Sequence, residues 1–105
     1  MDELSDRPVA AVAEEDGPRV TIALSGDLDA AGAPAARVVV DEALAAGGEE
    51  VVFDATDLRF MDSSGIAVLI HAANRTGSVT LVHANDRVRR IVEVTGLAEV
   101  IGIQP

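Results

Sequence analysis

The sequence of 105 residues contains no cysteine, tryptophan or tyrosine, and its two aromatic residues are Phe53 and Phe60. The absence of cysteine excludes a disulfide-stabilised scaffold, a cysteine-ligated zinc site and thiol chemistry. With so few aromatic side chains, the core has to be built from valine, leucine, isoleucine and alanine. Hydrophobic runs long enough to cross a bilayer are also missing, and the acidic N-terminus does not resemble a signal peptide. We therefore expect a cytoplasmic protein.

Basic residues are scarce, because eight arginines and no lysine stand against 18 acidic residues, giving a formal net charge of −10. This charge argues against binding to nucleic acid or to an anionic membrane surface, since phosphate groups attract basic faces. It favours a protein partner with a basic surface. The length suits one domain, and we expect a disordered acidic tail at residues 1–7 followed by a monomeric domain at residues 8–105.

The beginning of the domain has the pattern of a β-hairpin. Residues 9–14 read as a short strand, and residues 19–25 alternate between apolar and polar or small positions, which is typical of a half-buried strand. The intervening residues 15–18 contain a Gly-Pro pair and are typical of a turn. Residues 26–29 are expected to leave the sheet.

The rest of the chain alternates between helical and strand patterns. The predicted elements are a helix at 31–46, a strand at 50–55, a loop at 56–62, a helix from near Ser64 to Arg75-Thr76-Gly77, a strand at 78–83, a helix at 86–95 capped by Asn85, and a final strand at 100–103. Within the middle helix, Ile66, Leu69, Ile70 and Ala73 are expected to form the buried stripe. The order predicts an α/β fold with a mixed sheet of about five strands, an opening hairpin and three main helices.

One segment, Phe60-Met61-Asp62-Ser63-Ser64-Gly65, stands directly before a long apolar run. Either Asp62 or Ser63 can cap the helix by accepting hydrogen bonds from free backbone N–H groups, and we favour Ser63. Ser64 would then lie in the first turn, where the positive end of the helix dipole tolerates a phosphate. Gly65 has no side chain, so another protein's backbone could approach the hydroxyl of Ser64. The segment alone also fits an ordinary cap with a spare serine.

The chain resembles a STAS domain of the anti-sigma factor antagonist family from about Val9 to Ile103. Three blocks in the family's order carry this resemblance: Leu24-Ser25-Gly26-Asp27-Leu28-Asp29, the serine segment just described, and Val88-Arg89-Arg90-Ile91 with Thr95-Gly96-Leu97. The resemblance implies a partner-switching regulator. Its unphosphorylated form binds an anti-sigma factor, a serine kinase of the GHKL ATPase type, and thereby frees a sigma factor. Phosphorylation ends this binding, and a serine phosphatase restores it.

The resemblance also implies roles for particular residues. Ser64, directly before the motif glycine, matches the phosphorylated serine of the family. Asp62, Ser63 and Gly65 match the surface that faces the kinase, and the loop acids Asp27 and Asp29 match the partner-facing side.

Some of these positions have alternative interpretations. Asp27 and Asp29 could instead be turn or helix-cap acids. Phe60 and Met61 could either contact a partner or fold back onto the core. Three arginines of the last predicted helix are interpreted as a solvated face rather than a binding patch: Arg87, Arg89 and Arg90.

Two rival functions follow from the same sequence. An enzyme would need Ser63 or Ser64 as nucleophile, but the glycine of a nucleophile elbow is missing. His71 lies about two turns along the helix from Ser64, too far to act as its base, and His83 follows a strand. We therefore predict no catalysis, no cofactor and no metal site. The second rival keeps the fold but makes the chain an accessory subunit of a signalling assembly or a lipid transporter, without a kinase switch.

Overall fold

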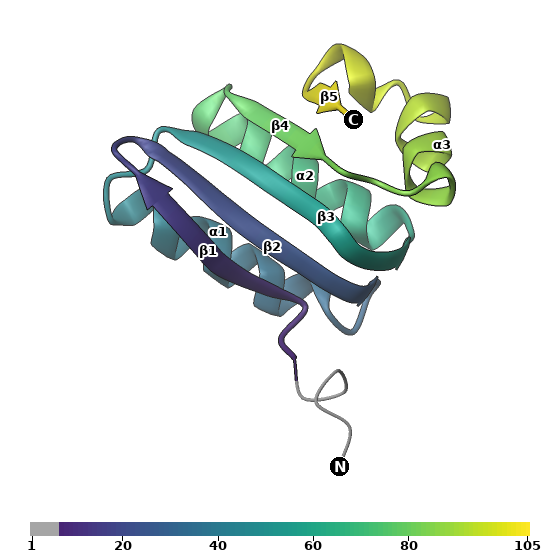
Figure 1. The fold of residues 1–105 in the computed structure, drawn as a ribbon, viewed down its shortest axis with the longest axis horizontal. Helices are drawn as coiled ribbons and strands as arrows, with labels where there is room; N and C mark the ends of the chain where they lie inside the picture. The colour runs from purple at the N-terminus through teal and green to yellow at the C-terminus, as the bar shows by residue number, and fades with distance from the viewer. Residues whose placement is uncertain (1–6) are drawn as a thin grey trace.

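A five-stranded mixed sheet carries helices on one of its faces in the computed structural model, which describes residues 7–105 (Figure 1). The strands are β1 (Ala10–Asp16), β2 (Arg19–Leu28), β3 (Glu50–Met61), β4 (Val79–Val82) and β5 (Gly102–Gln104). The helices are α1 (Ala33–Ala45), α2 (Ser63–Thr76), α3 (Asp86–Val94) and the short 3₁₀ helix η2 (Leu97–Glu99). The predicted α/β fold, with its hairpin, five strands and three main helices, is confirmed.

The strands lie side by side in chain order, β1-β2-β3-β4-β5. β1 runs antiparallel to β2, and the other neighbouring strands are parallel. Because right-handed crossovers that advance in one direction place their helices on one side of a sheet, α1 and α2 both lie behind the sheet in Figure 1. The face toward the viewer is left uncovered.

The opening hairpin turns at Gly17, whose φ of 62° is in the region that favours glycine. Its register runs from Ala10 opposite Leu24 to Asp16 opposite Arg19. The register shifts between Val12 and Glu14, so β1 contains a bulge at Ala13. The hairpin prediction is confirmed, although β1 extends to Asp16.

β2 and β3 are longer than their sequence patterns predicted. β2 continues to Leu28, so residues 26–28 do not leave the sheet, and β3 continues to Met61 through the predicted loop. Register shifts after Ala23 and after Gly26 explain the difference. Each shift inserts an extra residue into β3 and interrupts the alternation that a sequence pattern detects.

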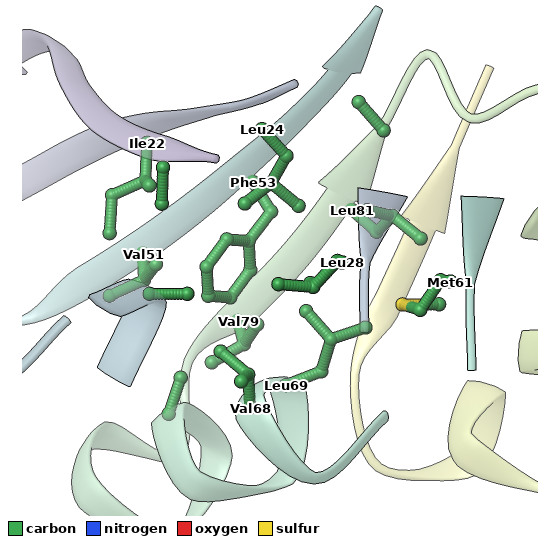
Figure 2. Close-up of a cluster of buried hydrophobic side chains, with 14 of the residues drawn as sticks. Ile22, Leu24, Leu28, Val51, Phe53, Met61, Val68, Leu69, Val79 and Leu81 are labelled. Atoms are coloured by element: carbon green, nitrogen blue, oxygen red, sulfur yellow. The ribbon is translucent and has the colours of Figure 1, made fainter. Parts of the chain in front are cut away.

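The core between the sheet and the helices is built around Phe53, as Figure 2 shows. Phe53 has no exposed surface and lies among Leu24 and Leu28 of β2 and Val68 and Leu69 of α2. Among residues 7–105, no polar or charged side chain is buried. The core is therefore held by apolar packing alone.

The two helices behind the sheet are also joined by polar contacts. Asp41 of α1 contacts both His71 and Arg75 of α2. Its Oδ1 lies 2.8 Å from His71 Nε2 and 2.5 Å from Arg75 Nη1. These side chains are partly exposed, so their contribution to stability is modest, on the order of 1 kcal/mol or less.

α2 is rotated relative to the predicted stripe. Its buried residues are Gly65, Ile66, Val68, Leu69 and Ala72. The prediction was right for Ile66 and Leu69 and wrong for Ile70, which is 40% exposed. Ala73 is partly buried and packs against the core.

The C-terminal part combines a confirmed helix with a shifted strand. Asn85 caps α3 as predicted, since its Oδ1 accepts a hydrogen bond from the N–H of Val88 at 2.9 Å. Beyond Gly96, the chain first forms η2 and reaches the sheet only at Gly102. The predicted strand at 100–103 therefore began too early, and Val100 is exposed.

The predicted acidic tail at residues 1–7 lies outside the described residues except for Arg7. The guanidinium of Arg7 pairs with Asp57 at 2.8 Å. In the part of the chain that the structure describes, no helix is long and apolar enough to cross a membrane.

The two phenylalanines provide a test of this core. We expect Phe53→Leu to lower the free energy of unfolding by about 1–2 kcal/mol and Phe53→Ala by about 3–5 kcal/mol, because a cavity remains at a buried site. Phe60→Ala is the matched control and should cost below about 1 kcal/mol, since Phe60 is 37% exposed. Urea denaturation measures all three variants, and an equal cost at both positions would contradict the assigned core.

Candidate functional site

The predicted site residues lie at the carboxyl ends of β2 and β3, where the first turn of α2 begins. In the parallel register, Asp27 is opposite Phe60 and Leu28 is opposite Met61. The backbone N–H of Asp62 points to the carbonyl oxygen of Leu28 at 3.4 Å. Residues far apart in the sequence thus meet at one end of the sheet, and we call Asp27, Asp62, Ser63, Ser64 and Gly65 the serine site.

Asp62 is the residue that caps α2. Its backbone is extended, with φ −114° and ψ −164°, and its Oδ1 accepts a hydrogen bond from the N–H of Ser64 at 2.8 Å. The carbonyl oxygen of Asp62 accepts from the N–H of Ile66 at 3.0 Å, which starts the helical pattern. The expectation that Ser63 is the cap is therefore wrong, because Ser63 is already the first helical residue.

The two serines of the first turn differ in exposure. Ser63 is exposed and Ser64 is half-buried. No acidic residue lies within the first turn itself, so the cap carboxylate of Asp62 is the negative charge that meets the helix N-terminus. Within residues 7–105, neither hydroxyl makes a hydrogen bond. Neither therefore has to lose one before it reacts or binds.

Gly65 is buried because the sheet lies directly beneath it. A Cβ built on Gly65 would lie 2.3 Å from Cγ of Met61 and 2.6 Å from the carbonyl oxygen of Leu28. Both distances are far below van der Waals contact. The missing side chain thus allows α2 to approach the ends of β2 and β3, rather than leaving space for another protein as the sequence suggested.

The two loop acids have different surroundings. Asp27 is exposed, and its Oδ1 lies 3.6 Å from Nη2 of Arg59. Asp29 is half-buried, and its Oδ1 accepts hydrogen bonds from the N–H groups of Ala31 at 3.1 Å and Gly32 at 3.2 Å. The carboxylate of Asp29 therefore organises the entry to α1, whereas that of Asp27 is available at the serine site.

The three residues that precede Asp62 differ in exposure. Met61 is fully buried and belongs to the core, whereas Phe60 is 37% exposed. The side chain of Arg59 is 77% exposed, and sequence reasoning did not single it out. The only available signal was an isolated cation within an acidic segment.

The two histidines have surroundings that do not include the serines. His71 is held by Asp41 of α1. His83 is exposed beyond the end of β4 and has a φ of 61°. In the described range 7–105, no group of three or more histidine, cysteine or acidic side chains could hold a metal ion. Within residues 7–105, neither serine is hydrogen-bonded to a histidine.

The chain belongs to the STAS domain family, since the family model described as "Mlab, STAS domain" matches residues 11–104. A curated relative is the anti-sigma-B factor antagonist of Listeria monocytogenes. It is 29% identical over 97 residues, which cover 89% of this chain and 85% of the relative.

Solved structures show the same fold. An anti-sigma factor antagonist from Mycobacterium paratuberculosis superposes with a TM-score of 0.82 at 24% identity, covering 91% of this chain and 84% of that one. The phosphorylated form of the Bacillus cell fate determinant SpoIIAA superposes with a TM-score of 0.67 at 20% identity, covering 90% of this chain and 89% of that one. At these identities the likeness concerns the fold.

Removing the cap should weaken α2. We expect Asp62→Ala to lower the free energy of unfolding by about 1 kcal/mol, because the N–H of Ser64 loses its side-chain acceptor. Asp27→Ala removes the same charge at the same end of the sheet and should change stability by less than about 0.5 kcal/mol. Thermal unfolding monitored by circular dichroism compares the two, and a larger effect at Asp27 would contradict the assigned cap.

Adding one methyl group at Gly65 should strain the site. We expect Gly65→Ala to destabilise the fold by about 1–3 kcal/mol, because α2 has to move away from Met61 and Leu28. Ser63→Ala, two residues earlier in the same turn, serves as the control and should stay within about 0.5 kcal/mol of the parent. A neutral Gly65→Ala variant would show that the first turn is not held by this close approach.

Proposed function

We propose that this protein is an anti-sigma factor antagonist controlled by phosphorylation of Ser64. In this proposal the unphosphorylated protein binds an anti-sigma factor that is a serine kinase of the GHKL ATPase type, and a sigma factor is released. The kinase phosphorylates Ser64, binding ends, and a serine phosphatase resets the cycle. The names of the relatives support the antagonist function, and the observation that carries the switch is the half-buried Ser64 in the first turn of α2.

The geometry supports a switch that leaves the fold intact. A phosphate on Ser64 adds about −1.5 to −2 charges beside backbone N–H groups at the positive end of α2. No core side chain has to move, because the hydroxyl lies in a partly exposed first turn rather than in the apolar core. The charge therefore acts mainly on whatever covers the serine site.

The same charge is strongly unfavourable in an interface. Asp62 and Asp27 lie at this end of the sheet, so the protein offers the phosphate little compensation beyond the helix terminus and the Arg59 guanidinium. Burying an uncompensated charge under a partner costs on the order of several kcal/mol. Because about 1.4 kcal/mol corresponds to a tenfold change in affinity, one phosphate is enough to separate the complex.

The partner-facing surface of this proposal consists of Asp27, Asp62, Ser63 and Ser64. Gly65 and Asp29 contribute by holding α2 and the entry to α1 in place. We further infer that the protein acts by binding and not by catalysis. The hydrogen-bond partner of His71 is Asp41 on α1, which supports this inference.

Substitutions of the two serines test the switch. Each anti-sigma factor kinase encoded in the native genome is purified and titrated with the parent protein and with three variants, Ser64→Ala, Ser64→Asp and Ser63→Ala. The proteins are then incubated with the kinase and ATP, and phosphate is mapped by mass spectrometry. We expect Ser64→Ala to bind like the parent and to accept no phosphate, and Ser64→Asp to bind at least about tenfold more weakly. Ser63→Ala should match the parent in both respects.

Two outcomes would contradict the proposal. Phosphate found on Ser63 instead of Ser64 would show that Ser63 is the regulated residue. Absence of binding to every kinase, together with stable association in a transporter or a large signalling assembly, would make the chain an accessory STAS subunit.

A further inference from the structure

The face of the sheet opposite α1 and α2 is uncovered, which is unusual for parallel strands. Sheets built from parallel strands normally have both faces covered by helices. Here β2, β3, β4 and β5 are parallel, yet the helices behind the sheet leave the near face open in Figure 1. Side chains from all five strands line a shallow hollow of about 240 Å³ on this face. We call it the open sheet face and define it by Glu14, Asp16, Thr21, Glu50, Val52 and Val82.

The register brings an acidic rim beside an aliphatic centre. Glu14 is opposite Thr21, which is opposite Val52 in the next strand. One row away, Asp16 is opposite Arg19, which is opposite Glu50. The carboxylates therefore gather where β1 ends and where β2 and β3 begin, and the valines lie further along the strands.

This rim keeps a net negative charge. Arg19 Nε donates to Glu50 Oε2 at 2.8 Å, so these two groups compensate each other. Glu14 and Asp16 have no ion-pair partner within residues 7–105. Two carboxylates at one end of a row that leads across Thr21 to the half-buried Val52 match a side chain with an aliphatic stem and a cationic head. This is the chemistry of arginine and lysine.

We propose that the open sheet face is a second docking surface, which binds a cationic segment of a partner protein. The stem of an arginine or lysine side chain lies over Val52 and Thr21, and its head pairs with Glu14 or Asp16. A second copy of this acidic chain is disfavoured by like-charge repulsion, and nucleic acid is repelled for the same reason. The carboxylate rim of this surface lies at the amino ends of β2 and β3, whereas Ser64 follows the carboxyl end of β3. Binding here is therefore independent of the serine site.

Titration with a defined peptide tests this proposal. The full chain, labelled with ¹⁵N, is titrated with an acetylated and amidated peptide of alternating valine and arginine, and with a matched peptide in which glutamine replaces arginine. We expect saturable amide shifts centred on Thr21, Val52 and Val82 with the arginine peptide only. The Glu14→Gln/Asp16→Asn double variant should lose at least about tenfold in affinity. Ser64→Asp should bind the peptide as the parent does.

A matched charge control distinguishes docking from general attraction. Glu42→Gln/Glu93→Gln removes the same two charges from exposed helix positions and should change affinity less than about twofold, because these sites are not on the open sheet face. An equal loss in both double variants, shifts spread over the whole acidic surface, or equally tight binding of free spermidine would overturn the proposal. Because the test needs no anti-sigma factor, its result stands apart from that of the Ser64 experiment.

Discussion

The position of the serine site depends on a single close approach between a helix and two strand ends. α2 can begin where it does because Gly65 leaves room for the side chain of Met61 and the carbonyl oxygen of Leu28. This approach turns Ile66, Val68, Leu69 and Ala72 toward the core. It also places the exposed Ser63 and the half-buried Ser64 beside the ends of β2 and β3. The packing of the core and the display of the hydroxyls are thus consequences of the same contact.

Sequence patterns predicted the element order but not the ends of the central strands. The alternation in β3 is regular at Val51, Phe53 and Ala55, and then the next buried residues are Leu58 and Met61. The bulges that cause this change depend on pairing with β2, so no local pattern contains them. The rotation of α2 has a similar origin. The predicted stripe, which includes Ile70, is locally reasonable, but the tight packing at Gly65 accompanies burial of a neighbouring face.

The serine segment was located by its sequence, whereas the roles within it required coordinates. Asp62 and Ser63 are both good capping residues, and only the backbone shows that helical geometry starts at Ser63. Likewise, Asp27 and Asp29 look equivalent in the sequence. The structure separates them, because the carboxylate of Asp29 is used by two backbone N–H groups while that of Asp27 stays exposed. The contacts therefore distinguish side chains that bind within the molecule, such as Asp29, from those available to a partner, such as Asp27.

The bulge in β1 has a consequence for self-association. β1 is an edge strand, and its outer backbone groups could pair with another molecule's strand. The irregularity at Ala13 interrupts the flat template that such pairing needs, and Glu14, Glu15 and Asp16 add repulsion along the remainder of the strand. The edge of this sheet is thus protected from fibrillar stacking by charge as well as by shape.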